Sequence, residues 1–339
     1  MKNLRDRLEV IAELPIAPGN ITVTPEGRII LSLHQFYNPE IKVAELTKDD
    51  IIPFPKSSKV KNITFDTVLG IKSDANGTIW MLDNGNQSKS VPKLVAWDTH
   101  KNELARVIYL PPPITLDSSF VNDLAVDLTR NVVYISDPAD GNKAALIRVD
   151  LKTGLACRIL QGHQSVVPDD IDLVVDGIPV QIKQPNGTLI RPHLGVNGIV
   201  LDTCNEWLYF CPMHGTSMYR VQSADLSNPD LSEAELGSKI ERYSQKPICD
   251  GITIDQENNI YLGDLANNAI GVITPDRCYQ ILVTDQKLSW IDSLTLGSDG
   301  CIYLDCNQLH RSAPLNAGEN TSMPPYYIFR LKSFTSEVA

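Results

Sequence analysis

The sequence lacks the short motifs by which several large enzyme classes are recognised. It contains no GxSxG, HExxH, Walker A or GxGxxG pattern, and no cysteine and histidine spacing typical of a zinc site. These absences argue against triad hydrolases, zincins and nucleotide-dependent enzymes. No run approaches the roughly 18 apolar residues that a membrane-spanning helix needs. Any chemistry must therefore come from residues that the fold brings together.

Basic residues and cysteine pairs are also scarce. The 339 residues include 30 Lys and Arg against 41 Asp and Glu, and this net charge of −11 disfavours nucleic acid and anionic membranes as partners. The seven cysteines form no CxxC pair, and several lie in apolar runs, where a thiol acts as a small hydrophobe. No apolar run follows the charged residues Met1 to Arg7, unlike a secretory signal. We therefore expect reduced thiols, a cytoplasmic location and a small-molecule partner.

What the sequence does contain is a repeat of two short β-rich runs joined by an Asp, Asn or Gly turn, which is a hairpin signal. The clearest example extends from Asp250 through Asn258-Asn259 to Asp264. The repeat recurs mostly every roughly 40 to 50 residues, the length of one four-stranded propeller blade. The six copies begin at Gly19, Leu69, Asn122, Asn197, Asp250 and Asp292.

The repeat predicts an all-β fold, a single six-bladed β-propeller spanning residues 1–339. Outer strands follow most hairpins, for example at Lys93–Asp98. The last copy has a third strand, Tyr326–Leu331, but no residues for a fourth. The alternating segment Leu8–Leu14 belongs to no blade, so we expect it to close the ring as the outer strand of the last blade, removing exposed edges. A two-sheet sandwich is the alternative.

Two segments do not fit the repeat. Residues 163–195 carry extra hairpin turns at Asp176-Gly177 and Asn186-Gly187 but leave no room for outer strands. We interpret them as an insertion between blades 3 and 4 that lies over one face and could act as a lid. Residues 225–238 form a second, part-helical insertion within blade 4. No low-complexity linker divides the chain, and we expect a monomer, a common state for closed propellers.

The candidate site residues stand where the copies begin. In a propeller, the loop leading into each innermost strand lies at the mouth of the central channel, so these residues converge. Four consecutive copies supply mixed amide and carboxylate oxygens, which suit a hard cation such as Ca²⁺ or Mg²⁺. Converging carboxylates also need a counter-ion. The alternative is that the same residues only make the side-chain-to-backbone turns that every blade requires.

Histidine adds two candidates for acid–base chemistry. His214 follows a second strand and His193 lies just before the loop of the fourth copy, so either could reach the mouth as a general base. A lone histidine is more often a packed or surface residue. The predicted site has Asp123 and His214 as catalytic groups, Asn122 and His193 as substrate ligands, and Asn197, Asp250 and Asp292 as metal ligands.

Other repeated aspartates are assigned to structure. Those that close a first strand stand where the hairpin turns and suit an Asx turn: Asp127, Asp202 and Asp255. Those that end a second strand are interpreted mostly as turns at the blade edge: Asp83, Asp137, Asp264 and Asp305.

An ordered series of segments resembles bacterial members of the major royal jelly protein/Yellow family, sometimes called dopachrome-tautomerase-like. The resemblance runs from about Ile79 to Leu331. It implies a six-bladed propeller with a ligand-binding channel, and insect members bind small aromatic amines. The segments that carry it include Ile79–Gly85, Lys93–Asp98, Phe120–Asp127, Tyr134–Asp137, Asp250–Ile252, Gly263–Ile270 and Trp290–Leu294.

A more distant similarity is to the gluconolactonase/senescence-marker/paraoxonase superfamily of metal-dependent lactonases and esterases. Asn197-Gly198 and Asp250-Gly251 match two of its metal positions, and Asn122-Asp123 matches an asparagine on its substrate side. That superfamily has a glutamate in the first blade, where this chain has Gly19-Asn20. Losing an anionic ligand should weaken Ca²⁺ binding.

Three functions are compatible with these residues. The first is a metal-assisted hydrolase of a small lactone or ester, in which the cation stabilises the oxyanion and a carboxylate or histidine activates water. The alternative is a Yellow-like binding protein or isomerase for a small organic molecule, with no required metal. A scaffold propeller that binds proteins on its faces is a third reading.

Overall fold

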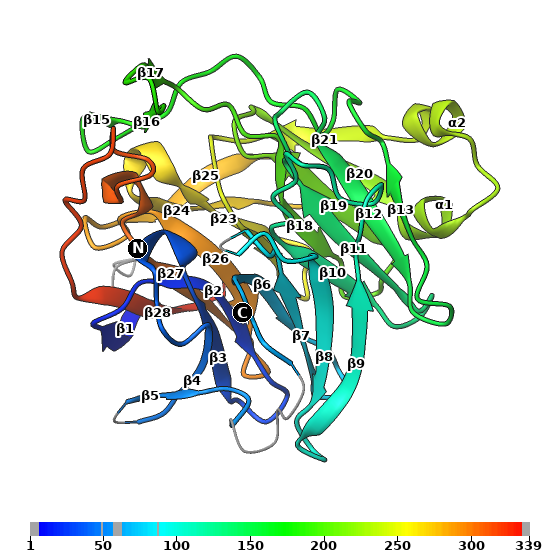
Figure 1. Ribbon diagram of the computed structural model, residues 1–339, viewed down its shortest axis with the longest axis horizontal. Coiled ribbons are helices and arrows are strands. Elements are labelled where there is room, and N and C mark those ends of the chain that lie inside the picture. The colour runs from blue at the N-terminus through cyan, green and yellow to red at the C-terminus, as the bar shows by residue number, and fades with distance from the viewer. Residues whose placement is uncertain (1–6, 49, 57–62, 87, 334–339) are drawn as a thin grey trace.

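The computed structural model describes residues 7–48, 50–56, 63–86 and 88–333. It contains six antiparallel four-stranded sheets arranged about one axis (Figure 1), which confirms the predicted six-bladed propeller. The innermost strands contact one another in a closed ring, in the order β2, β6, β10, β18, β22, β26 and back to β2.

Each blade is a simple meander from the axis outward. Blade 1 has β2 (Pro18–Val23), β3 (Ile29–Leu33), β4 (Val43–Leu46) and β5 (Ile51–Pro53). Blade 2 has β6 (Val68–Ser73), β7 (Thr78–Asp83), β8 (Lys93–Asp98) and β9 (Glu103–Tyr109). Blade 3 has β10 (Leu124–Asp127), β11 (Val132–Asp137), β12 (Ala145–Asp150) and β13 (Ala156–Ile159).

The second half of the ring follows the same plan. Blade 4 has β18 (Val196–Leu201), β19 (Trp207–Pro212), β20 (Ser217–Gln222) and β21 (Glu241–Gln245). Blade 5 has β22 (Ile252–Ile254), β23 (Ile260–Asp264), β24 (Ala269–Ile273) and β25 (Tyr279–Thr284). Blade 6 has β26 (Ile291–Leu296), β27 (Cys301–Cys306), β28 (Tyr326–Lys332) and, from the other end of the chain, β1 (Leu8–Leu14).

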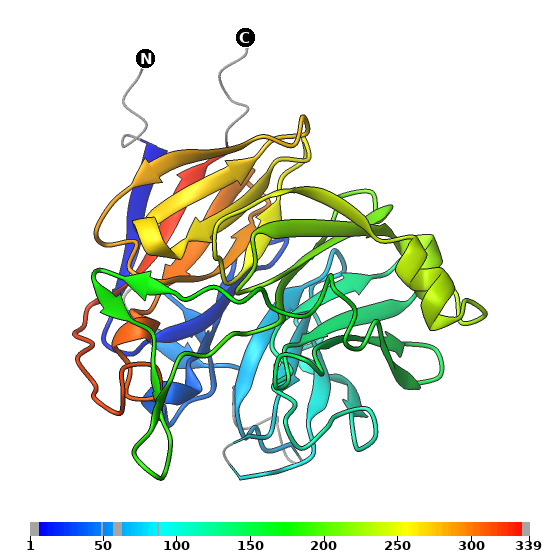
Figure 2. The same ribbon diagram turned by 90° about the horizontal axis from the view of Figure 1, so that it is seen from above.

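The N-terminal strand closes the ring as expected. β1 pairs antiparallel with β28, with Leu8 opposite Leu331 and Leu14 opposite Tyr326. Figure 2 shows the blue N-terminal strand beside the red C-terminal strand in one sheet. Leu14 is buried against Ile328 in the cluster between blades 6 and 1, so the closure is sealed by packing as well as by backbone hydrogen bonds.

The aspartates that close first strands make the expected turns. Asp255 accepts the backbone N–H of Glu257 and Asn259 at 3.0 and 2.9 Å and the hydroxyl of Tyr261 at 2.8 Å. Asp127 and Asp202 accept backbone N–H groups in the same way. These side chains hold the hairpins far from the site.

The aspartates that end second strands do more than the predicted edge turns. Asp137 is fully buried and accepts the Phe120 N–H at 2.9 Å and the Ser119 hydroxyl at 2.6 Å. Asp305 accepts the Ser293 N–H at 3.1 Å. Both bonds tie the end of a second strand to the region where the same blade's innermost strand begins, and this is where the candidate site residues lie.

The two insertions differ in their placement. Residues 163–195 contain two small hairpins, β14 (Val174–Val175) with β15 (Ile178–Pro179) and β16 (Ile182–Lys183) with β17 (Leu189–Ile190). Leu173, Val175 and Val180 of this segment pack with residues of blades 4 to 6. The apolar residues Val174, Leu189 and Ile190 are exposed. The segment 225–238 contains α2 (Glu233–Ser238) and most of α1 (Ser223–Ser227), outside β20 and β21 (Figure 1).

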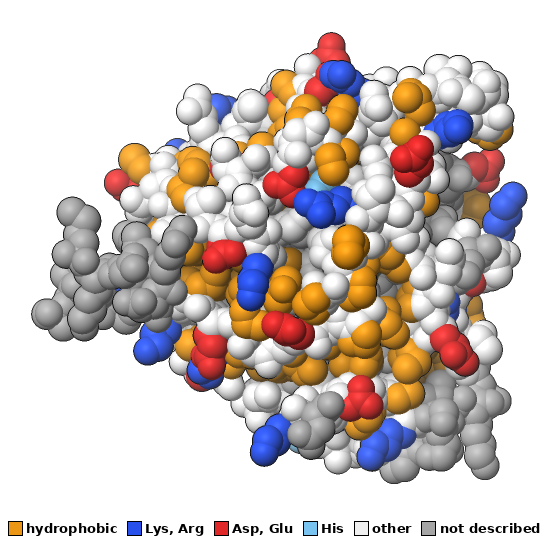
Figure 3. Space-filling model, turned by 90° about the vertical axis from the view of Figure 1, so that its left-hand side faces the viewer, with side chains coloured by type: hydrophobic (Ala, Val, Ile, Leu, Met, Phe, Trp, Pro, Cys, Tyr) orange, Lys and Arg blue, Asp and Glu red, His pale blue; other side chains and the backbone are white. Residues whose placement is uncertain are grey.

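One face of the molecule shows no segregation of charge (Figure 3). On the side that carries β1 and β28, apolar side chains are interspersed with acidic and basic ones, and the basic ones are scattered (Figure 3). In the described ranges no helix has the length and apolarity needed to cross a membrane. All seven cysteines are free thiols.

The closure makes a prediction about stability. Replacing Leu14 with alanine should lower the free energy of unfolding by about 2–5 kcal/mol, because it removes a buried side chain at the ring closure. Val10 lies on the same strand but is 37% exposed, so Val10→Ala should cost no more than about 0.5 kcal/mol. Urea denaturation measures both. Equal losses would show that β1 does not seal the ring.

Candidate functional site

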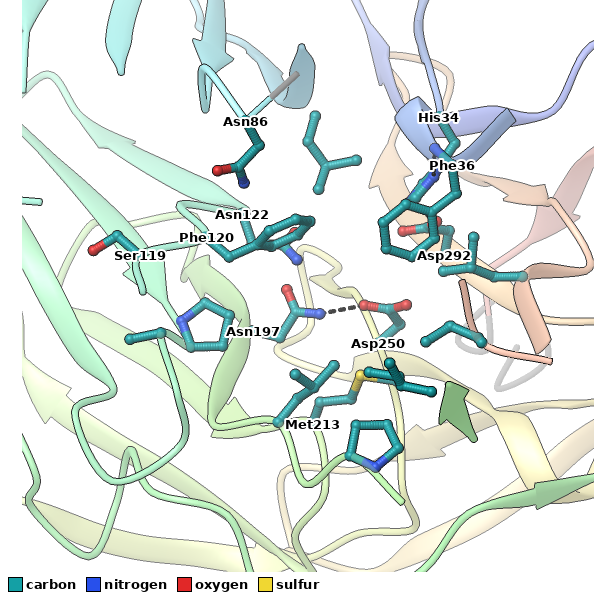
Figure 4. Close-up of a pocket in the computed structure, with 18 of the residues that line it drawn as sticks. His34, Phe36, Asn86, Ser119, Phe120, Asn122, Asn197, Met213, Asp250 and Asp292 are labelled. Atoms are coloured by element: carbon teal, nitrogen blue, oxygen red, sulfur yellow. Dashed lines mark hydrogen bonds and ion pairs between the residues drawn. The ribbon is translucent and has the colours of Figure 1, made fainter. Parts of the chain in front are cut away.

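The starts of the innermost strands and the loops before them surround a cavity of about 460 Å³, large enough for a small organic molecule (Figure 4). The first residues of five copies line it: Leu69, Asn122, Asn197, Asp250 and Asp292. Aromatic residues stand beside them: Phe36, Phe120 and Trp290. Apolar residues from the long insertion and from the segment after β27 add Ile182, Leu194, Leu309 and Leu315.

Neighbouring loops come this close because a glycine follows two of the polar residues. A Cβ atom on Gly198 would lie 2.8 Å from the carbonyl oxygen of Asp250, and one on Gly251 would lie 2.5 Å from that of Asp292. The Gly251 N–H instead donates to the Asp292 carbonyl at 2.7 Å. Any larger residue would push the loops apart, so these glycines are needed for close backbone approach.

Asp250 is the most tightly held of the polar residues. One carboxylate oxygen accepts a hydrogen bond from the Asn197 amide, and the other accepts from the Trp290 indole N–H at 2.9 Å. Burial raises the pKa of Asp250 to about 7, against the lowering effect of the Trp290 bond, and the charges of Cys249 and Asp123 add to the rise. Asp250 is therefore poised to exchange a proton near neutral pH.

Asp292 lies next to it, and its pKa is also raised. Burial raises the pKa of Asp292 well above its usual range, and the neighbouring carboxyls of Asp250 and Asp305 raise it further. Its Oδ2 accepts a hydrogen bond from the Asn307 amide. The His34 Nε2 is 3.9 Å from the same oxygen. Two neighbouring buried carboxyls, each with a raised pKa, thus share this part of the site.

His34 takes the place of the expected blade 1 ligand. A Cβ atom on Gly19 would lie 3.1 Å from Leu69 Cδ1 and 3.2 Å from the His34 Cα, which leaves little room for a side chain there. Burial lowers the pKa of His34 to about 3, so its ring is neutral. Its Nδ1 accepts the Phe36 N–H at 3.2 Å, which leaves the ring proton on Nε2, toward Asp292.

The structure brings four predicted residues together and places three elsewhere. Asn122, Asn197, Asp250 and Asp292 line the cavity, whereas Asp123, His193 and His214 do not. Burial raises the pKa of Asp123 to about 6 against the opposing charge of Lys72. Lys72 lines a second cavity of about 330 Å³, formed where the inner strands end, and Asp123 is among the lining residues of neither cavity.

The two candidate histidines support the insertion instead of facing the cavity. His214 is buried and its Nδ1 accepts the Leu194 N–H at 3.1 Å, and burial lowers its pKa to about 4. His193 lies with its ring nitrogens 3.1 Å from Asp172 and 3.4 Å from Asp170. Their predicted catalytic and substrate-binding roles would need a movement of these side chains.

Sequence reasoning missed the aromatic wall and His34. A usable signal was present, because Phe120 and Trp290 each stand two residues before a polar site residue, Asn122 and Asp292. The same loop that delivers the polar group thus also delivers a ring. His34 follows directly after the second strand of blade 1, a position that the convergence argument did not consider.

The predicted metal ligands are hydrogen-bonded to protein donors in this structure, and their binding of a cation stays a prediction. Across residues 7–48, 50–56, 63–86 and 88–333, no group of three His, Cys, Asp or Glu side chains is placed to hold a metal ion. Of the set Asn197, Asp250 and Asp292, Asp250 already has an N–H donor on each oxygen. Such donors satisfy a carboxylate in the way that a cation otherwise would.

By its fold, the protein is a closed six-bladed propeller that has a polar cavity at one mouth of its channel. The sequence profile of the family described as "Major royal jelly protein" matches residues 67–311, and the chain belongs to this family. It is 23% identical over 277 residues to Major royal jelly protein 3 of Apis mellifera, covering 77% of this chain and 47% of that protein. The match thus spans about half the length of this curated relative.

Solved structures of other propellers share the fold. A gluconolactonase from Xanthomonas campestris has a TM-score of 0.57 at 10% identity, covering 96% of this chain and 88% of that chain. Virginiamycin B lyase from Staphylococcus aureus has a TM-score of 0.52 at 15% identity, covering 96% and 99%. Aldose sugar dehydrogenase from Streptomyces coelicolor has a TM-score of 0.56 at 11% identity, covering 96% and 97%. Since these reactions differ, the likeness shows the fold alone.

The raised pKa of Asp250 makes stability depend on pH. Because the folded state holds the proton up to about pH 7 and the unfolded state releases it near 4, stability should fall as pH rises between these values. The unfolding free energy of the wild type should fall by roughly 2 kcal/mol between pH 5 and 8 on account of Asp250, and Asp250→Asn should abolish this fall. Urea denaturation at both pH values measures it. Asp140→Asn, at an exposed carboxylate, is the control, and an unchanged pH dependence in Asp250→Asn would refute the raised pKa.

Proposed function

We propose that the protein is a hydrolase of small, uncharged lactones or esters and that Asp250 activates the attacking water. The observation that carries this proposal is the placement of a carboxyl with a pKa of about 7 on the wall of the cavity. A general base works best when its pKa lies near the working pH. The amides of Asn122 and Asn197 stand beside it as hydrogen-bond donors (Figure 4).

The composition of the cavity supports an uncharged substrate. Its described lining includes Asp117, Asp250 and Asp292 but no Lys or Arg. Acidic walls disfavour an anionic ligand, and the rings of Phe36, Phe120 and Trp290 offer apolar contact. Hydrolysis of a lactone or ester produces a carboxylate, which the same walls would repel. The charge that selects a neutral substrate therefore also favours release of the product.

The reaction can be written with these residues alone. The Asp250 carboxylate takes a proton from water as the water oxygen bonds to the carbonyl carbon. The resulting oxyanion accepts N–H groups from Asn122 and from the second amide hydrogen of Asn197, which stabilise the developing charge. When the carbon–oxygen bond to the leaving group breaks, the alkoxide takes the proton back from Asp250. The net result is addition of one water across the ester bond.

This proposal predicts how activity depends on Asp250. Asp250→Asn should lower kcat/KM at pH 8 by at least about 100-fold, because it removes the general base, while an exposed change such as Asp140→Asn should leave activity unchanged. For the wild type, kcat/KM should rise with pH and level off above about pH 7. The assay uses a series of lactones and aryl esters.

A second function is favoured by the same lining. Acidic and aromatic walls without a basic residue also suit an organic cation, such as an aromatic amine. Calorimetry with an aromatic amine and its uncharged analogue separates the two functions. Tight binding of the amine, weak binding of the analogue and no turnover of any ester would establish a binding protein and contradict the hydrolase.

The predicted cation needs its own measurement. With N–H donors on both Asp250 oxygens, we expect millimolar Ca²⁺ and excess chelator to give the same melting midpoint. A bound ion stabilises the folded state by mass action and would raise the midpoint. A rise in the wild type that Asp250→Asn abolishes would overturn this expectation and restore a metal-assisted mechanism.

A further inference from the structure

The second cavity, of about 330 Å³, lies where the innermost strands end, whereas the first lies where they begin. The two cavities share no lining residue, so the second is a separate candidate site. Every blade contributes to it near the end of its innermost strand, through Val23, Ser73, Val126, Leu201, Ile254 and Leu296. The proposed hydrolase uses none of these residues.

One position of the innermost strand pairs with the second or third residue of the next strand in each blade. The residues at this position are Thr22, Lys72, Ala125, Val200, Thr253 and Thr295. All of them except Thr22 line the second cavity. Blades 5, 6, 1 and 2 are consecutive in the ring and carry the polar residues, while blades 3 and 4 carry Ala125 and Val200. The cavity therefore has a polar side and an apolar side at this level.

Two buried hydroxyls on the polar side have no partner in the protein. Thr253 and Thr295 are 2% and 3% exposed. Within the ranges that the structure describes, neither hydroxyl forms a hydrogen bond with another residue. Thr22 differs, because its Oγ1 accepts the Ser73 N–H at 2.8 Å. Buried polar groups nearly always have a hydrogen-bond partner, so these two hydroxyls indicate a polar partner inside the cavity.

Lys72 adds a positive charge to the same wall. It is the one Lys or Arg among the described residues that line this cavity, and its ammonium forms no hydrogen bond or ion pair with another described residue. Burial lowers the pKa of Lys72, and the charge of Asp123 acts against this from a longer distance. Asp123 Oδ1 instead accepts the Leu124 N–H at 2.8 Å. An anion in the cavity would offset the cost of burying this cation.

Two aspartates that line the cavity limit how much negative charge it can accept. Asp74 accepts the Thr78 N–H at 3.0 Å and the Trp80 indole N–H at 2.9 Å. Asp202 accepts the Glu206 N–H at 2.7 Å. Both carboxylates are thus satisfied within the protein and are not partners of Lys72. Their charges still disfavour a dianion, so one ammonium suits a ligand with a single negative charge.

We propose that the second cavity binds a small organic monocarboxylate. The carboxylate lies against Lys72, Thr253 and Thr295, which supply one charged donor and two hydroxyl donors. The apolar part of the ligand faces Ala125 and Val200 on the opposite side of the ring. This inference does not depend on the proposed hydrolase, because the two sites share no residue.

Calorimetry with benzoate tests the charge. Lys72→Met should weaken benzoate binding to the full chain at least about 10-fold, because a hydrogen bond to a charged group is lost. Lys72→Arg should retain most of the affinity. Lys101→Met is the matched control, since the Lys101 side chain is 70% exposed, and it should bind as the wild type does. Benzyl alcohol and inorganic phosphate should both bind more weakly than benzoate.

The hydroxyl contribution and the location need separate variants. Thr253→Val should weaken benzoate binding about 3-fold, because it removes one neutral donor at nearly constant volume. Thr188→Val changes an exposed threonine and should have no effect. Asp250→Asn removes a negative charge from the first cavity only, so it should leave benzoate affinity unchanged. A clear gain in affinity in Asp250→Asn would place the benzoate in the first cavity and contradict the inference.

A second readout uses the wild-type protein. Brief treatment with acetic anhydride, followed by mass spectrometry, should show that benzoate protects Lys72 from acetylation but does not protect Lys101. This measurement decides the question if Lys72→Met fails to fold. Equal acetylation of Lys72 with and without saturating benzoate would refute binding at this cavity.

The remaining outcomes are also decisive. If benzoate, hexanoate and butanoate all fail to bind at millimolar concentration, or bind wild type and Lys72→Met equally, the inference is wrong. Tighter binding of phosphate than of any carboxylate would show that the ligand class is wrong. Ester hydrolysis by Lys72→Met is measured alongside and should equal that of the wild type. Failure at the second cavity is thereby kept distinct from failure of the proposed function.

Discussion

The centre of this propeller depends on backbone contact between neighbouring inner-strand loops. Gly198 and Gly251 let the loop of one blade rest against the carbonyl of the next, and the Gly251 N–H bonds to Asp292. This spacing forces the side chains before those glycines, Asn197 and Asp250, into one small volume. Because the backbones lie so close, the carboxyl groups of the site are crowded and buried, and their pKa values are raised.

The crowded carboxyls are balanced mainly by neutral donors. Asp250 is held by an amide and an indole, and Asp292 by the amide of Asn307. Neutral donors stabilise a buried carboxylate less than a full positive charge does. The pKa of Asp250 therefore stays near 7. Buried aspartates at the ends of second strands have cationic partners instead, since Lys93 pairs with Asp83 and Arg158 with Asp137.

The sequence predicted the fold in detail because each blade is a local repeat. The bounds of Leu8–Leu14 and Lys93–Asp98 were predicted as observed, since alternation and turn residues are short-range signals. Convergence of Asn122, Asn197, Asp250 and Asp292 followed from topology alone. The aromatic wall did not, because the direction of Trp290 depends on a left-handed backbone and on an insertion with no repeat partner.

The floor and the ceiling of the cavity come from different parts of the chain, and this determines how the cavity can vary. The polar groups of the cavity floor come from the blades, whose sheets form the closed ring. Much of the ceiling comes from one loop and one late segment, through Ile182, Leu194 and Leu315. A change in these two segments would therefore reshape the cavity while leaving its polar floor in place.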